Sequence, residues 1–185
     1  LSEGEKITSI LPMPKTKKEA DDLGLIMVTK NGTGKKTSAK HFHDVRRSGL
    51  IAITLDAGDE LISVSFVSKG DDICIATTQG QSIRFKESDV REMGRNAAGV
   101  RVIRLAEEDK KKGIEADSVI SADVVTKDAK SPMLFVMSAN GYGKKTDLGE
   151  YKVQNRGGSG ILTANVTSKT GPLISARVVT EELEE

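Results

Sequence analysis

The sequence predicts an all-β fold made of about three similar blades, each a propeller-like unit of four strands. Three observations support this prediction: an apolar run followed by a glycine turn occurs three times, a similar apolar segment closes every unit, and helical periodicity is weak throughout. The turns are Asn31-Gly32, Gln79-Gly80 and Asn140-Gly141. Units of roughly 40–50 residues with four strand signals each are typical of propeller blades.

The first two strands of each unit form a predicted hairpin around the turn glycine. An apolar run precedes the turn, as in residues 25–28, and a short basic strand follows it, as in residues 33–37. Hairpin turns require a positive φ, which glycine adopts without steric cost and asparagine tolerates. The other two hairpins are expected over residues 73–85 and 134–146.

Two further strand signals follow each hairpin. The third signal is an apolar run after a glycine, in residues 51–53, 100–103 and 161–162. The fourth lies in residues 61–64, 119–122 and 173–176. This closing pattern also occurs alone at residues 6–10, and together with the start at Leu1 it favours a fragment of a longer protein.

We therefore expect a single repeat domain over residues 1–185. Residues 1–24 are assigned to the closing strand of a preceding blade plus a linker, and residues 180–185 to an acidic end. The blades are assigned to residues 25–67, 73–125 and 133–179. The polar segments are expected to be surface loops, at residues 12–22, 68–72, 107–113 and 126–132.

The composition excludes several classes of protein. Hydrophobic residues make up 37% and charged residues 30% of the chain, which suits a globular protein rather than a disordered one. No window approaches the roughly 20 apolar residues of a membrane span, so no membrane partner is expected. The single cysteine, Cys74, forms no internal disulfide and is interpreted as a small buried hydrophobe. An aromatic content of 3% disfavours recognition of unpaired bases by stacking.

Catalytic and metal-binding patterns are also weak. His41 and His43 are the two histidines of the chain, and no cysteine lies near them to complete a structural zinc site. The sequence has no convincing Ser/His/Asp set, no Cys/His pair and no cofactor fingerprint. It therefore predicts a non-catalytic binding module with no metal and no cofactor of its own.

Basic residues recur at fixed positions of the repeat. Lys36, Arg84 and Lys145 lie four residues after the turn glycine, and Arg47, Arg95 and Arg156 lie fifteen after it. Equivalent positions of a propeller lie on one rim, and duplex DNA carries a phosphate charge every ~1.7 Å, so a repeated cation is typical of a DNA-bending surface. The alternative is solvated surface strands with lysine protecting the edges. The predicted DNA contacts are Lys35, Lys36, Arg46, Arg47, Arg84, Lys86, Arg91, Arg95, Arg101, Lys144, Lys145 and Arg156.

A glycine-rich loop is the sharpest local motif. It consists of Gln154, Asn155, Arg156, Gly157, Gly158, Ser159 and Gly160. Glycines permit close backbone approach, and exposed N–H groups can hold phosphate oxygens. The spacing does not match a P-loop, and a simple glycine turn is the alternative interpretation.

Several motifs, in order, resemble the family of C-terminal domains of DNA gyrase A. They lie in residues 31–37, 59–62, 84–94 and 141–146, and the resemblance covers roughly residues 4–180, corresponding to middle-to-late blades. The resemblance implies a β-pinwheel, a six-bladed disc whose neighbouring blades exchange strands. It also implies that the rim wraps duplex DNA without sequence preference.

The same resemblance implies a place in a larger enzyme. The parent would be a type IIA topoisomerase that uses ATP and Mg²⁺ to introduce negative supercoils. Its partners would be gyrase B and the rest of gyrase A, in the bacterial cytoplasm at the nucleoid. The cleavage tyrosine has no counterpart in this chain, which is therefore expected to be non-catalytic.

Departures from the family pattern leave alternatives open. The family's box reads Gln-Arg-Arg-Gly-Gly-Lys-Gly, and here Asn155 and Ser159 replace two of its basic positions. The related topoisomerase IV protein has blades with degenerate boxes and is one alternative. A propeller-like protein-interaction module is another. Uncovered blade faces also predict possible self-association of the chain.

Overall fold

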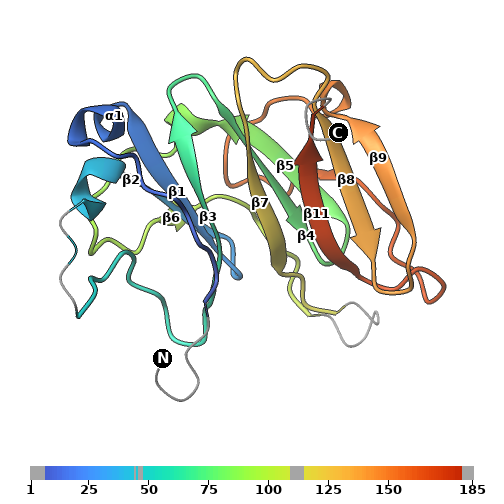
Figure 1. Cartoon of the computed structure of the whole chain (residues 1–185). Coiled ribbons are helices and arrows are strands. Elements are labelled where there is room, and N and C mark those ends of the chain that lie inside the picture. The colour runs from blue at the N-terminus through green and yellow to red at the C-terminus, as the bar shows by residue number, and fades with distance from the viewer. Residues whose placement is uncertain (1–6, 44, 46–47, 109–114, 181–185) are drawn as a thin grey trace.

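The computed structural model describes residues 7–43, 45, 48–108 and 115–180. Within them the chain forms three antiparallel sheets that stand side by side as successive blades (Figure 1). The strand orders are β3-β1-β2-β6, β10-β5-β4-β7 and β11-β8-β9. The predicted all-β, propeller-like architecture is therefore confirmed.

The element bounds follow the repeat. The strands are β1 (Leu23–Thr29), β2 (Thr33–Ser38), β3 (Leu61–Ser68), β4 (Asp72–Thr77), β5 (Gln81–Lys86), β6 (Val100–Arg101), β7 (Val119–Val125), β8 (Met133–Ser138), β9 (Gly143–Asp147), β10 (Ile161–Leu162) and β11 (Leu173–Val179). The helical elements are α1 (Lys17–Asp21) and the 3₁₀ turns η1 (Ala39–Phe42), η2 (Glu87–Asp89) and η3 (Leu148–Glu150).

The three predicted hairpins are present. Gly32, Gly80 and Gly141 have φ values of 83°, 84° and 82°, as the turns require. They join β1 to β2, β4 to β5 and β8 to β9. The closing strands β3, β7 and β11 each pair with the first strand of their own hairpin.

The third strand of a repeat pairs in the preceding blade, as the family resemblance implies. β6 comes from the second repeat but pairs with β2, with Val100 opposite Gly34. β10 comes from the third repeat but pairs with β5, with Ile161 opposite Ser82. The first two sheets consequently have four strands, whereas the third has three among the described residues.

Three local expectations differ from the structure. Of the closing pattern at residues 6–10, Lys6 lies outside the described residues and residues 7–10 belong to no strand. The segment 12–22, expected to be a loop, contains α1, because the fully buried Ala20 anchors one turn of helix. Residues 51–53 have the composition of an exchanged strand but pair with no strand among the described residues.

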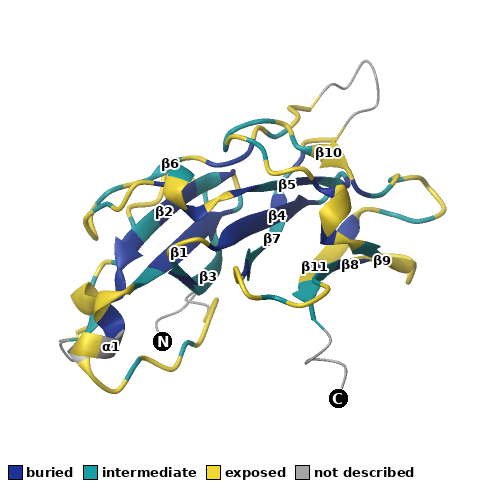
Figure 2. Cartoon of the chain, turned by 90° about the horizontal axis from the view of Figure 1, so that it is seen from above, coloured by how far each residue is buried: buried dark blue, intermediate teal, exposed yellow. Residues whose placement is uncertain are grey.

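The hydrophobic core lies between blades rather than at one centre (Figure 2). Ile26 and Val28 of the first blade pack with Ile73, Ile75 and other residues of the second. In the same way, Cys74 and Ala76 pack against the third blade. Alternate side chains of a strand point to opposite faces, so each blade uses one face for each neighbour.

Cys74 is buried within this second core, as the sequence predicted. Burial, assisted by the negative charge of Asp123, raises the pKa of its thiol to about 12. The reactive thiolate is therefore scarce at neutral pH.

The exchanged strands make glycine necessary where they begin. Gly160 has a φ of 75°, and a Cβ placed there would overlap the backbone oxygen of Ser82. Gly49, at the equivalent position of the first repeat, also has a φ of 75° but has no neighbouring atom within 4 Å. We expect Gly49→Ala to cost only the strain of a positive φ, roughly 1–2 kcal/mol.

Gly160→Ala should lower the free energy of unfolding by about 1–3 kcal/mol more than Gly49→Ala, because it adds a steric overlap to the same strain. Urea unfolding of both variants measures the difference. Equal losses would mean that the close contact of Gly160 with β5 contributes nothing to stability.

Candidate nucleic-acid interface

The two edges of each sheet face different surroundings. β3, β7 and β11 contact one another in that order, so we call their side the inner edge. β6, β10 and β9 close the opposite side of the three sheets, which we call the outer edge. Figure 2 shows the inner edge at the bottom and β6, β5 and β10 at the top.

Two chain segments run along the outer edge and lead into the exchanged strands. In residues 91–101, the Met93 N–H donates to the Lys36 carbonyl at 2.8 Å. In residues 152–162, the Gln154 N–H donates to the Arg84 carbonyl at 2.8 Å, which is the equivalent contact one blade later. These hydrogen bonds fix the backbone of the two segments against β2 and β5, and exposed side chains of the segments extend from this fixed backbone into solvent.

Exposed arginines lie along the first of these segments. Arg91, Arg95 and Arg101 were predicted as DNA contacts, and all three side chains are exposed. Arg104, just after β6, is also exposed, and its backbone N–H donates to the Gly158 carbonyl at 2.8 Å. Arg104 and Lys152 were absent from the predicted set, although Lys152, like Arg91, lies eleven residues after its turn glycine.

Lys35 is a correction to the predicted DNA contacts. Its side chain is fully buried, and its ammonium group donates to the carbonyls of Ala52 at 2.6 Å, Ala97 at 3.2 Å and Arg95. Burial, and secondarily the charge of Arg95, lower its pKa from the ordinary value. An ammonium with its three donors used internally is not available to a phosphate, so Lys35 instead holds the loop that presents Arg95.

The repeated cation four residues after the turn glycine links blades. Lys36 forms an ion pair with Glu87 and donates to the Glu87 carbonyl at 3.1 Å. Arg84 donates to the Leu148 carbonyl at 2.7 Å, and Glu87 and Leu148 are equivalent positions of successive repeats. The side chains of Lys36 and Arg84 are mostly buried. The recurrence of a cation at this position is therefore explained by contacts between blades, and needs no contact with a ligand.

Asp72 balances the charge of Arg84 in this contact. The Arg84 Nε donates to Asp72 Oδ2 at 2.9 Å, and Nη2 lies 2.8 Å from the same oxygen. Lys86 Nζ lies 2.7 Å from the other carboxylate oxygen, and its side chain is half exposed. Lys86 therefore remains accessible, whereas Arg84 is committed to the protein.

The glycine-rich loop of residues 154–160 fastens the third repeat onto the second. The Gly157 N–H donates to the Val102 carbonyl at 2.8 Å, so this N–H is not free to hold a phosphate. Arg156 donates from Nε to the Asp89 carbonyl at 2.7 Å and from Nη1 to the Arg101 carbonyl at 2.8 Å. Asn155 and Ser159 are exposed, and Gln154, Gly158 and Gly160 are partly buried.

The remaining predicted cations divide into two groups. Lys144 and Lys145 are exposed on β9, at the outer edge of the third blade. Arg46 and Arg47 lie outside the described residues. The structure therefore brings Arg91, Arg95, Arg101, Lys144 and Lys145 to one edge, and withdraws Lys35, Lys36 and Arg84 into blade contacts.

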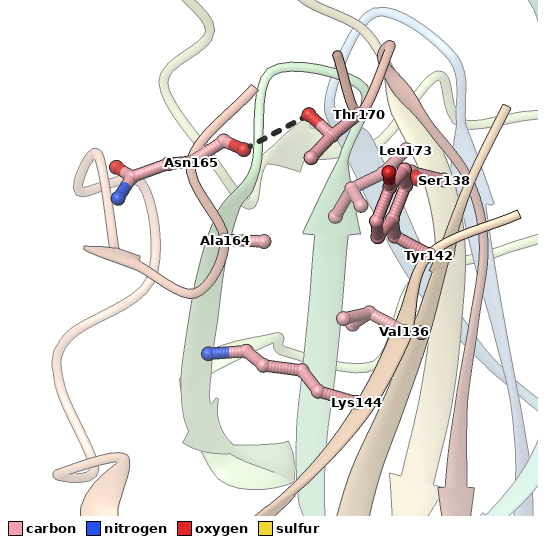
Figure 3. Close-up of a pocket in the computed structure, with 9 residues that line it drawn as sticks. Val136, Ser138, Tyr142, Lys144, Ala164, Asn165, Thr170 and Leu173 are labelled. Carbon is pink, nitrogen blue, oxygen red and sulfur yellow. Dashed lines mark hydrogen bonds between the residues drawn. The ribbon is translucent and has the colours of Figure 1, made fainter. Parts of the chain in front are cut away.

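A shallow cavity of about 190 Å³ lies between the second and third blades (Figure 3). It exists where Ala164 occupies the position at which Ile103 fills the junction of the first two blades. Figure 3 shows Lys144 extending from β9 across it. The lining residues are Val136, Ser138, Tyr142, Gly143, Lys144, Ala164, Asn165, Thr170 and Leu173.

This lining has no carboxylate, histidine or thiol, which are the groups that general acid–base or nucleophilic chemistry uses most often. Among the described residues there is also no cluster of three or more potential metal ligands. No helix in the described part of the chain is long and apolar enough to cross a membrane.

Three segments of the chain match one protein family. Residues 25–68, 71–110 and 132–180 match the family described as the DNA gyrase C-terminal domain, β-propeller. The DNA gyrase A protein of Lawsonia intracellularis is 38% identical over 182 residues, which is 98% of this chain and 21% of that protein. That of Staphylococcus epidermidis is 37% identical over 182 residues, again 98% of this chain and 19% of that protein.

Solved structures give the same fold. The crystal structure of the C-terminal domain of DNA topoisomerase IV has a TM-score of 0.75 and 26% identity, covering 86% of this chain and 47% of that one. The structure of a DNA gyrase A C-terminal domain has a TM-score of 0.73 and 26% identity, covering 87% of this chain and 50% of that one. The chain spans about a fifth of the length of the curated relatives it matches.

The blade-linking role of Arg84 can be tested against an exposed arginine. Arg84→Met removes a mostly buried cation and leaves Asp72 with Lys86 alone, so we expect the free energy of unfolding to fall by about 1–3 kcal/mol. Arg91→Met changes an exposed side chain and should alter it by about 0.5 kcal/mol or less. Urea unfolding of the two variants decides, and similar values would contradict a linking role for Arg84.

Proposed function

The chain belongs to the family of DNA gyrase C-terminal β-propeller domains, and from that premise we propose that it binds duplex DNA without sequence preference along its outer edge. The observation that carries this proposal is the set of exposed arginines in residues 91–104, whose backbone is fixed to the first two blades. Guanidinium groups pair well with phosphate oxygens. The exposed Lys86, Lys144, Lys145 and Lys152 extend the surface toward the third blade.

The proposed binding mode is electrostatic. Phosphate contacts carry no sequence information, and their affinity arises largely from the release of counterions. The net charge of +1 does not oppose this mode, because what matters is which charges lie on the edge. A surface formed by successive blades would bend the duplex as it followed them.

In the whole protein, we propose that this edge contributes to DNA wrapping during ATP-dependent negative supercoiling. Gyrase B, the rest of gyrase A, ATP and Mg²⁺ would supply the other functions, and this part would be non-catalytic. The corresponding location is the bacterial cytoplasm, at the nucleoid. Family membership supports these proposals, since the family is part of type IIA topoisomerases.

A second candidate is the equivalent role in topoisomerase IV. The observation in its favour is that the C-terminal domain of DNA topoisomerase IV has the same identity of 26% and a similar TM-score of 0.75. Both candidates propose the same DNA-binding edge. They differ in the supercoiling activity of the parent enzyme.

A salt titration tests the edge. Binding of the wild type to random duplex should be weak, about 10⁻⁴–10⁻⁶ M at physiological salt, and should fall steeply as salt rises. The triple variant Arg91→Gln, Arg95→Gln and Arg101→Gln should lower the slope of log affinity against log salt by about three units, one for each lost phosphate contact. Fluorescence anisotropy measures both quantities.

The matched control removes three cations near the inner edge: Lys30→Gln, Lys127→Gln and Arg177→Gln. Lys30 donates its N–H to the Glu60 carbonyl next to β3, Lys127 follows β7, and Arg177 lies on β11. The control has the same net charge as the first triple variant but should keep most of the wild-type slope. Equal losses in the two triples would reject the outer edge, and no binding of wild type at low salt would reject DNA binding itself.

A further inference from the structure

An arginine of the third repeat joins the two ends of a segment that belongs to the second repeat. We call residues 89–101 the arginine loop, after its exposed arginines, Arg91, Arg95 and Arg101. Arg156 donates from Nε to the Asp89 carbonyl at 2.7 Å and from Nη1 to the Arg101 carbonyl at 2.8 Å. The first and last residues of the arginine loop are therefore held on one guanidinium group, whose planar shape fixes the directions of its donors.

The backbone next to Arg156 adds two contacts in the same region. The Gly157 N–H donates to the Val102 carbonyl at 2.8 Å, and the Arg104 N–H donates to the Gly158 carbonyl at 2.8 Å. These contacts hold the residues that follow the arginine loop, but neither reaches its beginning. The side chain of Arg156 supplies the connection between the beginning of the loop and its end.

The first blade holds the middle of the arginine loop, through the Lys36 carbonyl and the Lys35 ammonium group described above. Arg91 lies between this middle part and Asp89, and Arg101 ends the loop. The backbone is thus fixed on both sides of Arg91 and at Arg101 in the absence of any ligand. A loop that is ordered in advance loses less conformational entropy when its side chains bind.

Arg156 has a different environment from Arg95, which occupies the same position of the repeat. The Arg95 side chain is exposed, whereas Arg156 is partly buried and donates to two backbone carbonyls. Asn155 and Ser159, the exposed residues of the glycine-rich loop, carry no charge. The cation of the glycine-rich loop is therefore directed at the arginine loop rather than at solvent.

We propose that Arg156 is a positioning residue for DNA binding. It fixes the arginine loop in the arrangement that presents Arg91 and Arg101 on the outer edge, and it contacts no phosphate itself. This role rests on the proposed function, because it lies within the same DNA-binding edge. The glycine-rich loop of one repeat thereby organises the arginines that the preceding repeat offers to the duplex.

A double-mutant cycle in DNA affinity tests this role. Arg156→Met should weaken the binding of random duplex by about fivefold at low salt, because a loop that is no longer joined at its ends must be ordered on binding. In the background of Arg91→Gln, Arg95→Gln and Arg101→Gln, the same change should have little effect, since the side chains that Arg156 positions are gone. Fluorescence anisotropy measures each affinity.

The control for net charge is Arg177→Met. Arg177 is an exposed arginine of β11 that donates to Asp123 at 3.0 Å, near the inner edge. Its replacement changes the net charge by the same amount as Arg156→Met, but it lies away from the arginine loop. The affinity of Arg177→Met should therefore stay close to that of the wild type.

Amide hydrogen exchange without DNA gives an independent measurement. Arg156→Met should raise the exchange rates of the arginine loop several-fold and leave those of β4, which lies between β5 and β7, unchanged. This contrast separates local opening of the loop from a general loss of stability. Unchanged exchange in the loop would overturn the proposal, and so would an equal rise in β4.

The affinities also distinguish this proposal from the proposed function. A direct phosphate contact by Arg156 would weaken binding equally in both backgrounds and lower the salt slope by about one unit, which would overturn the proposal. An affinity that Arg156→Met leaves unchanged would overturn it too, while DNA binding by the edge would stand. No binding of the wild type at low salt would instead reject the proposed function, and this inference with it.

Discussion

The rest of the structure depends on the short strand that each repeat contributes to the blade before it. Only two residues pair in each case, yet they bring the backbones of successive repeats into direct contact at Gly99 and Gly160. The contact places the following residues, Val102 and Thr163, on the carbonyls of the preceding turn. Blade order, the inter-blade cores and the course of the outer edge all follow from it.

The same exchange explains the division of the basic residues. A segment that packs against β2 or β5 helps to bury side chains of those strands. In the first blade the covered residue is Lys35, whose ammonium group donates to two carbonyls of the segment, those of Arg95 and Ala97, and to the carbonyl of Ala52. In the second blade it is the equally buried Ile83. The positive charge of Lys35 is thus satisfied inside the protein. The segment that covers it carries Arg91, Arg95 and Arg101, whose side chains remain exposed to solvent.

Sequence alone predicted the hairpins, the number of blades and the buried Cys74, because glycine turns and apolar runs are determined locally. Repeat spacing located Lys36 and Arg84 but not their surroundings, since a recurring cation looks the same whether it faces a phosphate or the carbonyl of the next blade. Lys35 was misassigned for a related reason: a buried lysine needs acceptors from residues 52, 95 and 97, which are distant in sequence. Strand exchange entered only through the family resemblance.

The unequal filling of the two blade junctions has a consequence for cooperativity. Each blade touches only its neighbours, so the energetics are approximately those of a one-dimensional array with nearest-neighbour coupling. Ile103 fills the first junction, whereas Ala164 leaves the second with an open cavity. Coupling is therefore weaker at the second junction, and fluctuations that separate one blade from the array should begin with the third and leave the first pair intact.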